Sequence, residues 1–192
     1  MSHVAPILFF DYVDPLCYLL EVELAEALSE PGAVEPTRVP AEVCPPPSAL
    51  LDPGGPWWTT RWTSATDVAG ALGRTLVEPR ILPWTRKAHE LVLHARRHGM
   101  GAQAHAAVFE AIFGRGADIG RVDVLVELAR ELGLDANEAK AVLDVDRFSD
   151  EVAALGTRAT EAGVQEIPAL VRDTGMLRGF HNRDTLRTFL LR

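Results

Sequence analysis

A buried strand that leads directly into a helix is the feature that most limits the fold of this chain. Residues 7–13 (ILFFDYV) are apolar, aromatic and β-branched over the length of a buried strand, so they predict one. Asp14 and Pro15 follow at once, and an aspartate suits the N-cap of a helix while a proline suits its first turn. A helical period of apolar residues then continues until Pro31-Gly32 stops it. These elements predict the first half of a β-α-β unit.

Further strand patterns complete this unit and form a second one at the other end of the chain. Residues 34–39 predict the second strand, and Pro36 favours either an edge position or a strand that begins after it. Residues 167–172 and 176–178 predict two strands joined by the turn DTG, which together make a hairpin. A terminal helix over 182–191 gives a β-β-α unit.

The segment between the two units is predicted to be a loop followed by helices. Residues 40–56 hold six prolines and two glycines, which is typical of a loop. Six helical segments follow, within 57–75, over about 84–98, 101–114 and 121–132, from an Asp135 N-cap onward, and over about 147–162. The element order predicts an α/β fold with one small mixed sheet and an α-helical insertion.

The composition limits the classes of partner. Apolar residues make up 47% and charged residues 24% of the 192 residues, as in soluble globular proteins. The net charge of −8 argues against binding to nucleic acid or to an anionic membrane surface. No apolar stretch approaches the ~20 residues that span a bilayer, and the N-terminus lacks the basic start of a signal peptide. We therefore expect a cytoplasmic protein with reduced thiols.

Three motifs, in this order, resemble the DsbA family, which is a thioredoxin fold with a helical insertion. FFDYVDPLCY is similar to the strand and Cys-Pro-x-Cys-Tyr site of the family, PWTRKAHEL to its Asn-Thr-x-x-Ala-His segment, and FSDEVAALGTRATEAGVQEIPALV to the stretch that ends in Gly-Val-Pro before a strand. The resemblance is strongest to the FrnE-like branch and to its relatives, the 2-hydroxychromene-2-carboxylate isomerases and kappa-class glutathione transferases. It implies a thioredoxin-like domain over 1–56 and 164–192, with an inserted helical domain over 57–163.

Two positions depart from this family pattern. Asp14 stands where the redox enzymes place the attacking cysteine and the isomerases and transferases a serine, and Glu166 replaces a glycine near Pro168, the expected cis-proline. A carboxylate cannot replace the thiolate that attacks a disulfide. The charge of Asp14, increased if Glu166 folds back beside it, disfavours a thiolate at Cys17, and no cationic residue lies within the motif. We expect the pKa of Cys17 to be normal or raised, which suits a buried, apolar role.

The resemblance implies a set of site residues and a choice of functions. The catalytic candidates are Asp14 and Cys17, no metal ligands are expected, and the candidates for binding a substrate or thiol are Pro15, Leu16, His89, Glu166, Ile167 and Pro168. The expected function is that of a DsbA-like thiol–disulfide oxidoreductase family member without full dithiol activity. The alternatives are a glutathione-dependent isomerase or transferase-like enzyme, and a non-catalytic binding protein. Glutathione is the one cofactor implied, the partner is a small thiol or a protein thiol or disulfide, and a homodimer is implied by the family alone.

Three further features leave alternatives open. Cys17 and Cys44 are either free thiols or a disulfide, although a bridge is the less favoured reading. His94 and His98 have a spacing that can hold a metal, but the basic segment HARRHG favours a solvated helix face. The tryptophans are either core of the helical block or an aromatic wall of a pocket over the helix start; they are Trp57, Trp58, Trp62 and Trp84.

Overall fold

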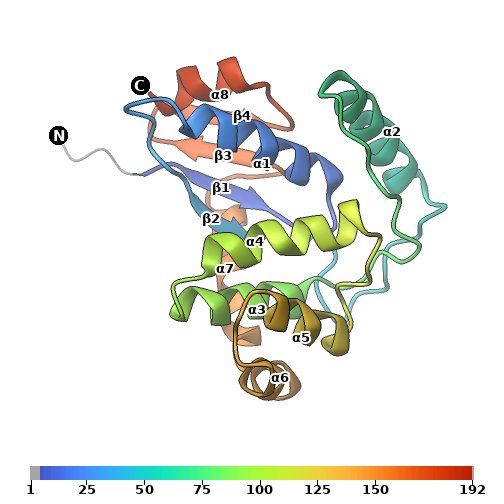
Figure 1. Cartoon of the computed structure of the whole chain (residues 1–192). Helices are drawn as coiled ribbons and strands as arrows, with labels where there is room; N and C mark the ends of the chain where they lie inside the picture. The colour runs from blue at the N-terminus through green and yellow to red at the C-terminus, as the bar shows by residue number, and fades with distance from the viewer. Residues whose placement is uncertain (1–4, 192) are drawn as a thin grey trace.

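One sheet combines strands from the N-terminal part of the chain with strands from its C-terminal part (Figure 1). The computed structural model describes residues 5–191. Within them the sheet has the order β2-β1-β3-β4. These strands are β1 (Ile7–Phe10), β2 (Thr37–Pro40), β3 (Ala169–Arg172) and β4 (Gly175–Arg178). Strand β2 pairs parallel to β1, whereas β3 is antiparallel to both β1 and β4, so the predicted mixed sheet is confirmed.

Helices cover both faces of this sheet. They are α1 (Pro15–Leu28), α2 (Pro56–Ala71), α3 (Arg86–Arg97), α4 (Gly101–Phe109), α5 (Val122–Glu131), α6 (Ala136–Asp144), α7 (Ser149–Glu161) and α8 (Arg183–Leu190). Figure 1 shows α1 and α8 together on one side of the sheet and α7 with the helical block on the other. A π-helical turn, η1 (Glu110–Gly114), extends α4. Among residues 5–191, no helix combines the length and apolar character needed to span a bilayer.

Strands β1, β2 and β3 are shorter in the structure than in the sequence pattern, whereas β4 begins one residue earlier than predicted. The strand predicted over 7–13 ends at Phe10, because the carboxylate of Asp11 accepts backbone N–H bonds from Tyr12 at 2.7 Å and from Val43 at 2.7 Å. These bonds turn the chain out of the sheet. Strand β2 begins after Pro36 and lies at the sheet edge, as the proline predicts.

The main hydrophobic core runs through the sheet and the helical block without a break. One cluster of buried residues joins Phe9 of β1 and Leu20 of α1 to Trp58 of α2 and Phe109 of α4. The predicted division into a thioredoxin-like part and an inserted part stays a prediction about domains. The packing places the start of α1 between these two parts.

Candidate functional site

The start of α1 is fixed by Asp14, whose side chain is buried. Asp14 is the N-cap, in an extended conformation, and its Oδ1 accepts the backbone N–H of Leu16 at 2.9 Å. Its relative exposure is 0%. The capping role predicted from the Asp-Pro pair is confirmed. The second oxygen, Oδ2, faces away from the helix toward α2.

Arg61 of α2 supplies the cation that compensates this carboxylate. Its Nε lies 2.8 Å and its Nη2 2.7 Å from Oδ2 of Asp14. Its Nη1 donates to Glu166 at 2.8 Å, and its Nη2 also donates to the carbonyl of Ile167, next to the cis Ile167–Pro168 peptide bond. Most of the guanidinium donors are therefore used, and the group bridges the helix start to the segment before β3.

Arg61 is a site residue that was not predicted from the motifs, and it places a positive charge near Cys17 that the motifs do not indicate. Glu166 does lie near Asp14, but the arginine is held between the two carboxylates. The only signal in the sequence is that Arg61 is the single basic residue of α2. Nothing in its spacing predicts that it reaches a partner 47 positions away.

The ionisation of Asp14 is set by two opposing effects. Complete burial raises its pKa, and the guanidinium of Arg61 and the Leu16 N–H oppose this shift. The pKa of Arg61 is itself raised: burial favours its neutral form, but the neighbouring Asp14 outweighs this effect. The two side chains form an ion pair in a largely desolvated position, since arginine stays protonated in proteins.

Cys17 lies behind this pair and is closed off from solvent. It is 1% exposed, within the core cluster between α1 and the sheet. Burial raises the pKa of its thiol well above the ordinary value, and the nearby Asp14 adds to this effect. The expected raised pKa is confirmed. Cys17 and Cys44 are both free thiols, so the structure contains no bridge between them, and the Cys44 Sγ donates instead to the carbonyl of Ala49 at 2.8 Å.

A cavity of about 1060 Å³ opens over the start of α1. Its polar lining includes Asp14, Glu42, Thr60, Arg61, Arg86 and Glu166, and Trp57 and Ile167 are among its apolar lining. Of the predicted site residues, this brings together Asp14, Glu166 and Ile167. The other predicted residues lie outside the lining; they are Pro15, Leu16, Cys17, His89 and Pro168.

Glu42 and Arg86 are lining residues that the sequence analysis also missed. Arg86 pairs with Oε2 of Glu42 at 2.6 Å from its Nη2, and it also donates to the hydroxyl of Ser149 at 3.0 Å. The other oxygen of Glu42, Oε1, is buried without a partner. Buried polar atoms are normally hydrogen-bonded, so Glu42, a residue of the cavity wall, retains an unused acceptor.

His89, a predicted candidate for binding a substrate or thiol, has its polar contact in the interior of the protein. Its Nε2 lies 3.0 Å from Oδ1 of Asp11, and both side chains are buried. The same carboxylate holds Tyr12 and Val43. His89 thus anchors α3 to the end of β1 rather than facing the cavity.

The tryptophans divide between the two predicted roles. Trp58 is 1% exposed, stacks on Trp62 with ring centroids 5.3 Å apart, and donates its Nε1–H to Glu78 at 3.0 Å. Trp57 is 38% exposed and lines the cavity. One turn of α2 therefore supplies both core and pocket wall.

The prediction of a solvated face for the segment HARRHG is wrong for His94. His94 is 3% exposed, because it lies on the side of α3 that packs against α6. Its neighbour one turn on, His98, is exposed as predicted, with 41% of its side chain accessible.

Fold and site together define a thioredoxin-fold protein with a helical insertion, in which a buried carboxylate–arginine pair occupies the helix start. The DSBA-like thioredoxin domain family matches residues 74–191. The chain belongs to this family. The matched region includes Glu166 and Pro168 but not Asp14, Cys17 or Arg61.

Relatives and solved structures agree with this assignment. The uncharacterized protein YwbO of Bacillus subtilis (strain 168) is 30% identical over 181 residues, which cover 92% of this chain and 90% of YwbO. The probable DsbA oxidoreductase SCO1869 from Streptomyces coelicolor superposes with a TM-score of 0.82 at 22% identity, over 98% of this chain and 88% of that one.

Two further structures represent the other branches of the fold. A 2-hydroxychromene-2-carboxylate isomerase gives a TM-score of 0.73 at 17% identity, over 97% of this chain and 92% of that one. The cytosolic disulfide reductase DsbM from Pseudomonas aeruginosa, solved with glutathione, gives 0.73 at 18% identity, over 97% of both chains. These likenesses show the fold, while the site of this chain has to be read from its own residues.

Proposed function

We propose that this DsbA-family protein has no dithiol exchange activity and instead binds a small polar ligand in the cavity over the start of α1. The observation that carries the proposal is the Asp14–Arg61 ion pair. It holds a carboxylate at the helix start, where the resemblance to the family places the attacking thiol. Disulfide exchange needs an accessible thiolate. Cys17 is buried, absent from the cavity lining, and has a raised pKa.

The lining of the cavity supports a ligand with both charges or with several hydrogen-bonding groups. Two arginines, Arg61 and Arg86, lie beside three carboxylates, and each arginine is already paired. An anion alone would meet little free positive charge, whereas the free Oε1 of Glu42 can accept from an ammonium or amide N–H. Trp57 adds an apolar wall.

Glutathione is the ligand that we propose for this cavity. It carries an ammonium group, amides and carboxylates, and the DsbM structure with glutathione supports its fit to this fold. The repulsion that Asp14 alone would exert on a thiolate is reduced, because Arg61 contacts the carboxylate from the cavity side. A glutathione-dependent isomerase or transferase activity is therefore the second candidate. A cytoplasmic location, where glutathione and reduced thiols occur, belongs to the same proposal.

Insulin reduction by dithiothreitol tests the loss of dithiol exchange. The unmodified protein is expected to be no faster than Asp14→Ser, which keeps an N-cap and adds no thiol. Asp14→Cys restores a Cys-Pro-Leu-Cys sequence beside Arg61, which favours a thiolate. This variant is expected to be at least about tenfold faster, or about 1.4 kcal/mol lower in barrier. Catalysis by the unmodified protein above the Asp14→Ser rate would overturn the proposal.

Isothermal titration with glutathione and with S-methylglutathione tests the ligand. Both are expected to bind, since the proposed contacts involve the backbone and charged ends of the peptide rather than its sulfur. Glu42→Gln is expected to weaken binding about tenfold, or about 1.4 kcal/mol, whereas Glu26→Gln, an exposed change on α1, leaves it unchanged. An absence of heat at millimolar glutathione removes this ligand from the proposal.

A further inference from the structure

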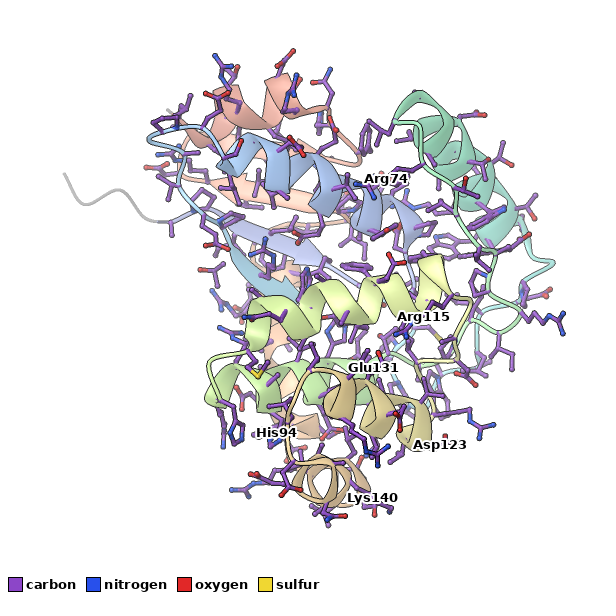
Figure 2. All side chains as sticks on the ribbon, viewed as in Figure 1. Arg74, His94, Arg115, Asp123, Glu131 and Lys140 are labelled. Carbon is purple, nitrogen blue, oxygen red and sulfur yellow. The ribbon has the colours of Figure 1, made fainter. Side chains whose placement is uncertain are left out.

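A second group of metal-ligating side chains lies in the helical block, where α3 packs against α6. His94 and His98 are one turn apart on α3, and their ring centroids lie 4.6 Å apart in an edge-on arrangement. Figure 2 labels His94 on α3 and Lys140 on α6, both in the lower part of the view. None of the residues in this group lines the cavity over α1.

Glu138 of α6 brings a third ligand to the two histidines. It is the third residue of α6, whose start is fixed by the N-cap Asp135. Its Oε1 lies 3.5 Å from Nε2 of His98. One ligand atom from each of His94, His98 and Glu138 lies within 4.8 Å of the other two. The sequence does not indicate this third ligand, because Glu138 reaches the histidines only through the docking of α6.

One ring nitrogen of His94 has no hydrogen-bond partner. This nitrogen, Nε2, is buried. A buried polar atom without a partner is destabilising, so such atoms are rare and call for an explanation. A ring nitrogen that makes no hydrogen bond has a lone pair to offer when the imidazole is neutral, which is the form that coordinates a metal.

We propose that His94, His98 and Glu138 bind one divalent transition-metal ion, with Zn²⁺ as the best fit, and that the ion clamps α6 to α3. Two imidazoles and a carboxylate are a zinc ligand set that leaves a fourth position for water. Zinc bonds of about 2.0–2.1 Å require ligand atoms roughly 3.4 Å apart. Coordination thus draws the ligand atoms closer together, which the exposed side chains of His98 and Glu138 permit.

Zinc binding to the untagged full chain, freed of metal with a chelator, tests this site. Calorimetric titration with zinc chloride is expected to show one equivalent bound with micromolar affinity. His98→Gln and Glu138→Gln are surface changes and are each expected to weaken binding at least about tenfold. Glu161→Gln, which removes an exposed carboxylate on α7, is the matched control and is expected to bind as the unmodified protein does. Saturating zinc should also raise the melting temperature of the unmodified protein, and raise it less in the two variants.

Cobalt binding distinguishes this site from one built on the thiols. Co²⁺ is expected to give visible bands of nitrogen and oxygen ligation without the near-ultraviolet band of a cobalt–thiolate bond. A thiolate band at one equivalent, no zinc binding by the unmodified protein, or unchanged affinity in both His98→Gln and Glu138→Gln would each overturn the proposal. Because Cys17 and Asp14 are outside this group, the result is independent of the proposed ligand cavity.

Discussion

At the scale of single residues, the site is governed by the unequal environments of Asp14 and Arg61. Asp14 is fully buried, and its Oδ2 depends on the guanidinium of Arg61 alone among the described side-chain contacts. Arg61 also contacts Glu166 and the Ile167 carbonyl, and 13% of its side chain is exposed. Loss of the arginine therefore leaves the buried charge of Asp14 without a partner, whereas loss of the carboxylate leaves the arginine with other partners.

This asymmetry predicts different costs for the two neutralising variants. Arg61→Gln is expected to lower the free energy of unfolding by about 3 kcal/mol, and Asp14→Asn by roughly 1 kcal/mol. Urea unfolding at neutral pH measures both. The double variant should be more stable than the sum of the two losses indicates, since the unpaired carboxylate is absent from it. Losses within about 0.5 kcal/mol of each other would contradict the asymmetry.

At the scale of elements, a largely buried polar network ties α1, β2 and α4 together. Glu21 of α1 accepts from Nε of Arg38 on β2 at 2.8 Å, and its Oε1 lies 3.0 Å from Nε2 of His105 on α4. The Nδ1 of His105 lies 2.9 Å from the hydroxyl of Tyr12. Burial alone would raise the pKa of Glu21, but the hydrogen bonds from His105 and Arg38 lower it from 4.5 to about 2.

The lowered pKa of Glu21 predicts a loss of stability in acid. A carboxyl whose pKa is lower in the folded state stabilises the fold above its unfolded pKa, and this contribution is lost as the pH falls through the folded value. The pH window is therefore about 4.5 down to about 2. The shift corresponds to roughly 3 kcal/mol. Urea unfolding across this range should show the loss in the unmodified protein and in Glu26→Gln, an exposed change on the same helix. In Glu21→Gln the free energy of unfolding should fall clearly less steeply as the pH is lowered. An unchanged pH dependence in this variant would assign the acid sensitivity to other groups.

At the scale of the whole molecule, the insertion and the thioredoxin-like part share aromatic packing. Phe109 of α4 lies with its ring centroid 4.9 Å from Tyr12 and 5.8 Å from Tyr18. It is 1% exposed. The core cluster that contains it also includes residues of β1, α1 and β3. A core of this kind favours one cooperative unfolding transition, even where the chain is divided by an insertion.

Phe109→Ala tests this cooperativity. The change is expected to cost about 3–5 kcal/mol and to shift one transition rather than split it. Tryptophan fluorescence reports the insertion, which contains all four tryptophans, and pulsed alkylation of Cys17 reports the start of α1. The two midpoints in urea should coincide in the unmodified protein and in the variant. Val145→Ala, at a position 69% exposed, should change neither. Separate midpoints would instead favour the insertion as an independent domain.

The local features of this protein could be predicted from its sequence. Hydrophobic periodicity gave the element order, and the N-caps Asp14 and Asp135 gave two helix starts, because both signals act over a few residues. The edge position of β2 followed from one proline. The motifs in VDPLCY and VQEIPALV also led to the correct fold family.

The contacts between elements were decided by the tertiary structure alone. Arg61 reaches Asp14 across 47 positions because α2 docks on α1, and Glu138 reaches His94 and His98 because α6 docks on α3. Burial of His94 and Cys17 depends on the same docking. Charge compensation and desolvation depend on which side chains come within a few ångströms in space, and spacing along the chain does not encode this. The sequence alone therefore determined where the site begins, whereas the fold decided which charges face each other there.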